Sequence, residues 1–164
     1  MINRRRFWIT TILAWMVFIG IDFLFHASLL ERLWQEEIEL IKSAKDLFIL
    51  IPVGYLSFFL LTVLVGYAFT KIYQKKPKSK EVIGFVMIFG LLFSGSNLLA
   101  LFAYVDIPLK NLIIYNVVYF IEISSVIFIF YKAMFRRKIN KLIWYSILTF
   151  FVLVVIAIVI QNLT

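Results

Sequence analysis

Residues 142–160 read LIWYSILTFFVLVVIAIVI, a stretch without a single charged side chain. A helix rises about 1.5 Å per residue, so about 20 apolar residues cross the ~30 Å hydrocarbon layer of a bilayer. Four earlier stretches are similarly long and predominantly apolar: 7–26, 47–70, 82–104 and 109–131. We therefore predict an all-α bundle of five transmembrane helices, forming a single domain over residues 1–164.

The composition excludes several classes of protein. Hydrophobic residues make up 63% of the chain and charged residues 16%, which is too apolar for a soluble domain of this size. Because cysteine is absent, disulfides, thiolate metal sites and thiol catalysis are excluded. With His26 as the single histidine, the chain by itself cannot form a site that needs two histidine ligands.

The basic residues predict the orientation of the helices. Thirteen of the 17 Lys and Arg residues fall in three clusters, at 4–6, 71–80 and 132–141. Cytoplasmic loops are rich in Lys and Arg, so we expect the N-terminus inside the cell and the C-terminus outside, in the plasma membrane. These clusters lie at the ends of the apolar spans, which favours contact with anionic lipid headgroups and argues against nucleic acid as a partner.

The segment 28–43 is the longest polar connection. Ser28-Leu29-Leu30-Glu31 has the pattern of a capping box, which predicts the start of a new helix. Apolar residues then recur at helical spacing, at Leu30, Leu33, Trp34, Ile38 and Ile41. We expect a short amphipathic helix on the outer surface, serving either as a connector resting on lipid or as a docking site for a partner.

The other connections are short and predict how the helices pack. Such links favour an up-down bundle in which spans two to five contact their neighbours in sequence. The pairs Gly90/Ser94 and Ser96/Ala100 are spaced for close approach between helices, within the bundle or in a homo-oligomer. The apolar half of the fifth span, 150–160, is expected to face lipid or a partner subunit.

Three acidic or histidine side chains fall inside the spans: Asp22, His26 and Glu122. A charge near the bilayer centre costs at least about 2.5–3.5 kcal/mol, so each of them requires a reason. Asp22 and His26 are four residues apart and share one face of the first helix. We place this pair in the outer half of the membrane and Glu122 near the middle of the fourth span.

Other polar residues of the third and fourth spans extend this candidate site. Asn97 and Asn116 lie in the outer half, and Tyr115, Tyr119 and Glu122 recur along one face of a helix. The predicted binding residues are Asp22, His26, Asn97, Asn116, Tyr119 and Glu122. They would form one pocket, open to the outside, for a cation, a proton or a small polar solute. The alternative is a hydrogen-bonded network that fixes the register of the helices.

Motifs for other chemistries are missing from the sequence. One imidazole and two carboxylates can ligate zinc or iron, but they are not in an H-x-x-E-H or similar cluster. There is no G-x-S-x-G elbow, phosphate loop or dinucleotide fingerprint. We therefore assign no catalytic residue, metal ligand or cofactor, and the sequence does not decide whether the protein is an enzyme.

The stretch 21–30, IDFLFHASLL, resembles the first-span signature of small bacterial and archaeal membrane-protein families of unknown function. In those families an Asp, an aromatic residue and a His precede a short outer helix. A glycine-containing third span and an acid in the fourth follow, as Gly90, Gly95 and Glu122 do here. The resemblance implies a shared architecture and one site for Asp22, His26 and Glu122.

Two functions remain open from the sequence. The first is a membrane protein that binds or carries a solute, cation or proton in the polar pocket. The second is a non-catalytic accessory subunit of a larger membrane complex, docking through the fifth span or the outer helix.

Overall fold

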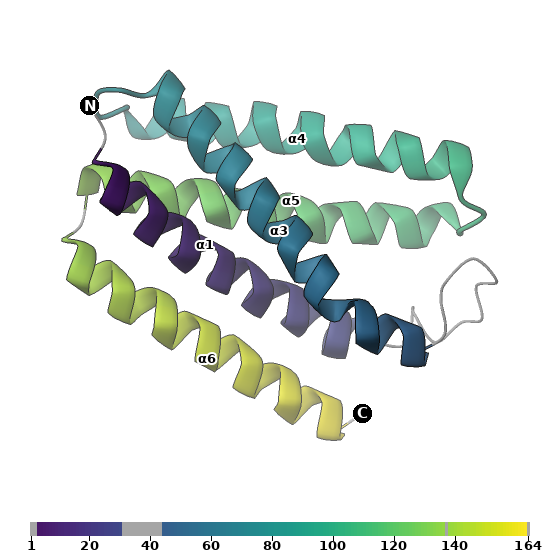
Figure 1. The fold of residues 1–164 in the computed structure, drawn as a ribbon. Helices are drawn as coiled ribbons and strands as arrows, with labels where there is room; N and C mark the ends of the chain where they lie inside the picture. Colours follow the sequence, from purple (N-terminus) through teal and green to yellow (C-terminus); the bar gives the residue numbers. More distant parts are fainter. Residues whose placement is uncertain (1–2, 31–43, 137, 164) are drawn as a thin grey trace.

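The computed structural model describes residues 3–30, 44–136 and 138–163, and it consists of helices joined by short connections (Figure 1). The elements are α1 (Arg4–Leu24), η1 (Phe25–Leu29), α3 (Ala44–Ile72), α4 (Ser79–Tyr104), α5 (Leu109–Tyr131), η2 (Lys132–Arg136) and α6 (Ile139–Leu163). Here η denotes a π-helical turn that continues the preceding α-helix. Five helices are long and apolar enough to cross a membrane, which confirms the five predicted spans.

The first helix ends later than we expected. The N–H of Leu30 donates to the carbonyl of Phe25, five residues earlier, so the chain stays helical through Leu29. Ser28 lies within this π-helical turn, and its hydroxyl donates to the carbonyl of Leu24. The prediction that Ser28 begins a new helix is therefore wrong. Most of the expected amphipathic helix, at 31–43, lies outside the described residues.

Four helices form a row, and the fifth crosses it. The order in the row is α6, α1, α5 and α4, and α3 packs obliquely against α1 and α5 (Figure 1). The expectation that spans two to five contact their sequence neighbours holds for α4 and α5. It does not hold for the other two neighbouring pairs, because α3 packs mainly against α1 and α5, and α6 packs against α1 and η1. A cavity of about 360 Å³ separates α5 from α6, between Ser125 and Ser146 among others.

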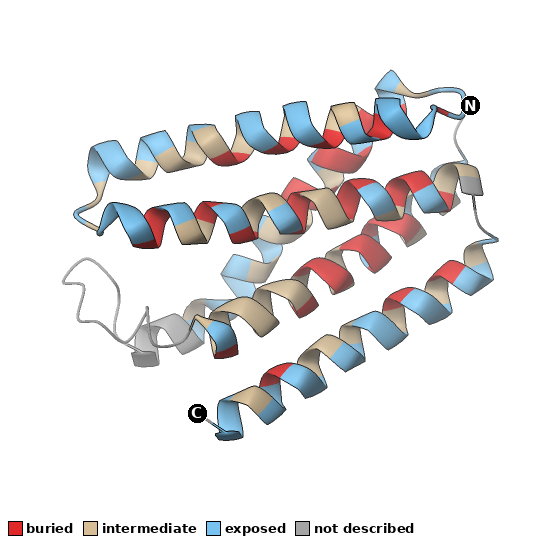
Figure 2. Cartoon of the chain, turned by 180° about the vertical axis from the view of Figure 1, so that it is seen from behind, coloured by how far each residue is buried: buried red, intermediate tan, exposed pale blue. Residues whose placement is uncertain are grey.

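The third span approaches α5 closely at one of its two small-residue pairs. Gly90 and Ser94 are buried, and a Cβ atom added at Gly90 would lie 2.7 Å from the ring of Phe120. This pair therefore lets α4 and α5 pack tightly, as predicted. Ser96 and Ala100 are exposed, so the second pair makes no such contact. Figure 2 shows that the buried residues of α4 lie on its side toward α5.

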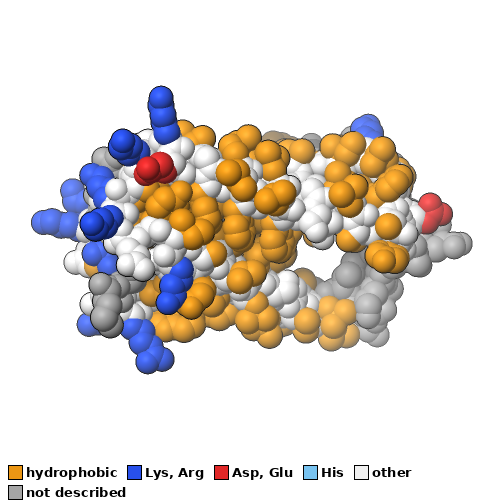
Figure 3. Space-filling view, turned by 90° about the horizontal axis from the view of Figure 1, so that it is seen from above, with side chains coloured by type: hydrophobic (Ala, Val, Ile, Leu, Met, Phe, Trp, Pro, Cys, Tyr) orange, Lys and Arg blue, Asp and Glu red, His pale blue; other side chains and the backbone are white. Residues whose placement is uncertain are grey.

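The exterior of the bundle is that of a membrane protein. Large apolar side chains are exposed along the helices, and Lys and Arg gather at one end of the molecule (Figure 3). We call this the basic end; it holds the start of α1, the connection between α3 and α4, and η2. Helix length and hydropathy identify a multi-pass membrane protein, while the side of the membrane that the basic end faces stays a prediction.

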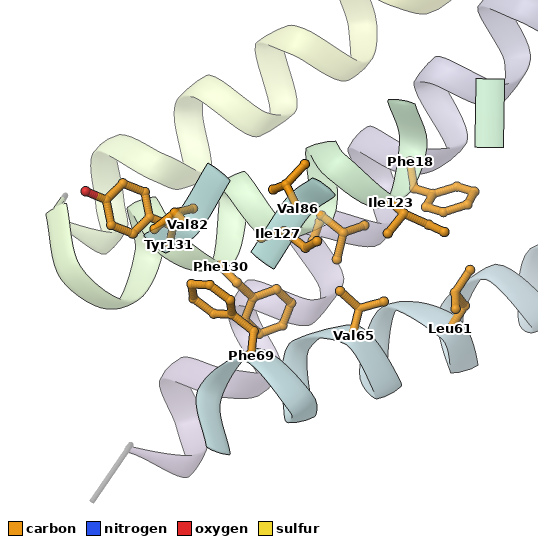
Figure 4. Close-up of a cluster of buried hydrophobic side chains, with 12 residues drawn as sticks. Phe18, Leu61, Val65, Phe69, Val82, Val86, Ile123, Ile127, Phe130 and Tyr131 are labelled. Atoms are coloured by element: carbon orange, nitrogen blue, oxygen red, sulfur yellow. The ribbon is translucent and has the colours of Figure 1, made fainter. Parts of the chain in front are cut away.

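The main apolar core joins α1, α3, α4 and α5. Phe18 of α1, Val65 and Phe69 of α3, and Ile127 and Phe130 of α5 are buried in it (Figure 4). Lipid tails are as apolar as these side chains, so close packing rather than water exclusion holds the helices together. This core fixes the rotation of α5 about its axis and therefore the direction of its single acid.

Candidate functional site

The three ionisable residues predicted from the spans lie together in the structure. One ligand atom from each of Asp22, His26 and Glu122 lies within 4.8 Å of the others. Asp22 comes from the end of α1, His26 from η1 and Glu122 from the middle of α5. We call these three residues the triad. It joins the first and fourth spans, as expected for residues of one site.

The geometry of α1 and η1 sets the positions of Asp22 and His26. Nε2 of His26 lies 3.8 Å from Oδ1 of Asp22, and both side chains are about one-fifth exposed, at 21% and 18%. The α-helix changes to a π-helix at Phe25, between the two residues. Single π-helical turns are rare and frequently occur at functional sites.

Glu122 is the most deeply buried member of the triad. The residue is only 1% exposed, and its neighbours Ile123 and Val126 are buried as well. Its Oε1 atom is buried without a hydrogen-bond partner among the described residues. An unsatisfied buried acceptor costs about 1–3 kcal/mol, more when it is charged. The Oε1 atom of Glu122 therefore destabilises the fold unless a further group donates a hydrogen bond to it or binds it as a cation.

Two tyrosines of α5 form an aromatic wall beside the triad. The ring of Tyr115 lies 5.5 Å from that of His26, and Tyr119 stacks on Tyr115 at 6.1 Å. Tyr119 also contacts Phe18 and Phe93 through its ring. Among the predicted site residues, Tyr119 is thus placed as a packing partner. Tyr115, which is not among the predicted binding residues, contacts the histidine.

The two asparagines form a separate contact. Nδ2 of Asn97 donates to Oδ1 of Asn116 at 3.1 Å, and Nδ2 of Asn116 donates to the carbonyl of Leu112 at 2.8 Å. This bond joins α4 to α5, whereas the triad joins α1 and η1 to α5. Asn116 and Glu122 are six residues apart, which places them about 9 Å apart along the helix axis and about 120° around it. The structure thus groups the predicted residues into a triad and an asparagine pair.

The triad has the make-up of a ligand set for one small cation. Ligand atoms about 2.0–2.2 Å from a tetrahedral zinc ion lie about 3.3–3.6 Å from one another. The ligand atoms of the triad lie within 4.8 Å of one another, so binding one ion would draw them together by roughly 1 Å. The triad does not line the cavities of about 680 and 360 Å³, and an outward-open pocket at the triad stays a prediction.

No family model matches the chain, and neither a curated protein nor a solved structure is similar enough to match it. The resemblance carried by residues 21–30 therefore identifies no family. The geometry of the triad is the observation on which a functional argument can rest.

Proposed function

We propose that this protein binds a divalent transition-metal cation inside the plasma membrane, at Asp22, His26 and Glu122. The observations that carry the proposal are the convergence of their three ligand atoms within 4.8 Å of one another and a buried Oε1 atom of Glu122 that has no hydrogen-bond partner among the described residues. This choice goes further than the sequence, which indicated a cation, a proton or a polar solute and assigned no metal ligand.

Charge balance favours a divalent ion. Two carboxylates and a neutral imidazole carry two negative charges, which one divalent cation neutralises. A net charge inside the bilayer costs at least about 2.5–3.5 kcal/mol, so a monovalent ion would leave the site with an unfavourable charge. The same argument explains how two acids can occupy neighbouring positions in apolar surroundings.

The ligand atoms favour a transition metal over magnesium or calcium. Imidazole nitrogen suits zinc, iron and copper, whereas magnesium and calcium take oxygen ligands. Three protein ligands also leave a fourth position of a tetrahedral site open, as in sites that exchange a bound molecule. Binding requires deprotonated carboxylates and a neutral imidazole, so it releases protons and strengthens as pH rises.

The location of the triad suggests the route of exchange. Asp22 and His26 are partly exposed and lie at the end of the first span opposite the basic end. Since the basic end is predicted to face the cytoplasm, we propose that the cation enters and leaves from the outside.

A thermal-stability assay tests the proposal. The purified, chelator-treated protein is heated in detergent with zinc, manganese, magnesium or calcium. We expect zinc to raise the melting temperature of the wild type and of Asp106→Asn, which removes an exposed acid at the turn before α5. Glu122→Gln should lose the shift. Equal shifts in Glu122→Gln and Asp106→Asn would contradict a site at the triad, and no shift with any cation would favour a proton instead.

The accessory-subunit function is a second candidate, favoured by the packing of α6. This helix rests on α1 and η1, and its other side exposes large apolar residues: Leu148, Phe151, Val152, Val155, Ile156 and Val159. Either lipid or a partner helix fits such a surface. Extraction in a mild detergent followed by native mass spectrometry separates the two, since a monomer alone would contradict the subunit function.

A further inference from the structure

A second site lies at the basic end and is independent of the triad. A cavity of about 680 Å³ is lined by residues from the start of α1, the end of α3, the α3–α4 connection and η2. Its polar wall is strongly basic, because Arg4, Arg6 and Lys71 line it and the lining contains no acid. We propose that this cavity binds the phosphate of an anionic phospholipid headgroup.

Contacts within the wall hold the basic groups in place. Arg6 donates from its guanidinium to the carbonyl of Ala133, which ties the start of α1 to η2. The Nζ atom of Lys71 lies 5.2 Å from the centre of the Tyr67 ring, a cation–π contact. Two of the three cations are thus oriented by contacts with neighbouring residues and need little ordering when an anion binds.

The start of α1 adds to the positive potential. Oδ1 of Asn3 accepts from the N–H of Arg5 at 2.9 Å, so the first turn of the helix is closed by its own cap. The positive end of the helix dipole still favours an anion nearby. The helix dipole thus adds to the attraction of an anion, which comes mainly from the three basic side chains that line the cavity.

The cavity suits a lipid better than a free anion. Its volume is that of a site for a small molecule, far larger than one phosphate ion requires. Beside the basic groups its wall contains the apolar side chains of Phe7, Met134 and Phe135. It lies where the spans end, at the depth of lipid headgroups, and basic pockets between transmembrane helices bind such headgroups.

Native mass spectrometry in neutral detergent micelles tests this site, because such micelles have no surface potential to attract lipid nonspecifically. Phosphatidylglycerol is the anionic probe and phosphatidylcholine the neutral one. The variant Arg4→Gln/Lys71→Gln neutralises two exposed residues of the cavity and leaves Arg6 in place. The control, Lys75→Gln/Lys76→Gln, removes the same charge from exposed positions outside the lining.

We expect the cavity variant to bind phosphatidylglycerol at least about tenfold more weakly than the control, since each basic residue contributes about 1 kcal/mol. Equal losses in the two variants would overturn the proposal, as would equal binding of phosphatidylcholine by the wild type. Displacement of the lipid by millimolar inorganic phosphate would assign the site to a free anion and contradict a lipid ligand. Unfolding midpoints of both variants show whether the fold is kept.

Discussion

Nε2 of His26 lies 3.8 Å from Oδ1 of Asp22, and the Glu122 carboxylate reaches the same place from another helix. The 3.8 Å separation is too long for a hydrogen bond between these two atoms. It exceeds by a few tenths of an ångström the roughly 3.3–3.6 Å between two ligands of a tetrahedral zinc ion. At this separation the two groups form a loose ion pair when the imidazole is protonated, and the proposed metal ion would bind between them.

His26 should control which cation is preferred. In the variant His26→Asn the nitrogen ligand is replaced by an amide oxygen, so we expect zinc affinity to fall at least about tenfold while manganese affinity changes less. Competition between the two ions, followed by elemental analysis of the washed protein, measures the ratio. An unchanged ratio of zinc to manganese would show that the imidazole is not a ligand.

Glu122 should weaken the metal-free fold. Replacing it with Met keeps a long side chain and removes the buried Oε1 atom that has no described partner. We expect Glu122→Met to raise the free energy of unfolding of the chelator-treated protein by about 1–3 kcal/mol. Unfolding by sodium dodecyl sulfate in mixed micelles measures it. A loss of stability would mean that the carboxyl group contributes to helix packing. That result is expected if Glu122 belongs to a hydrogen-bonded network that fixes the register of the helices.

Close packing between α3 and α5 depends on Gly66. A Cβ atom there would lie 2.1 Å from the ring of Phe130, which is fully buried. We expect Gly66→Ala to destabilise the fold by about 1–3 kcal/mol, measured by unfolding in mixed micelles.

Gly54 provides the matched control in the same helix. A Cβ atom at Gly54 meets nothing within 4 Å, so Gly54→Ala should be neutral or slightly stabilising. Equal effects of the two substitutions would contradict the packing of Gly66 against Phe130.

The orientation of the bundle can be tested by labelling, because the chain has no cysteine of its own. A cysteine at Lys76, in the α3–α4 connection, should be protected from an impermeant thiol reagent in intact cells. A cysteine at Lys110, at the opposite end of the bundle, should react. The reverse pattern would refute the predicted orientation and move the entry of the cation to the cytoplasmic side.

The sequence predicts the spans well because the bilayer imposes both their length and their apolar character. It also predicts that Asp22 and His26 share a face, since that follows from helical spacing alone. The direction in which the Glu122 side chain points could not be predicted. It depends on tertiary packing, because the contacts of Phe18 and Phe130 with α3 set the rotation of the helices about their axes.

The errors have the same origin. Ser28 has a local capping pattern, yet the helix continues through it as a π-helical turn. Short connections suggested that α5 and α6 would pack together, but α6 rests on α1. The grouping of Asn97 and Asn116 with the acids rested on depth in the membrane and stays a prediction, while the structure shows the two asparagines in contact with each other. Depth does not distinguish the face of α5 toward α4 from the face toward α1.

Equilibrium dialysis against zinc, with the bound metal measured by elemental analysis, tests the central claim most directly. We predict one zinc ion per chain in the wild type and in Asp106→Asn, with binding lost in Asp22→Asn/Glu122→Gln. Extended X-ray absorption fine structure at the zinc K-edge should then show nitrogen and oxygen ligands at about 2.0–2.2 Å from the zinc ion. A folded wild type without bound zinc, or a double variant that retains it, would contradict a metal site at Asp22, His26 and Glu122.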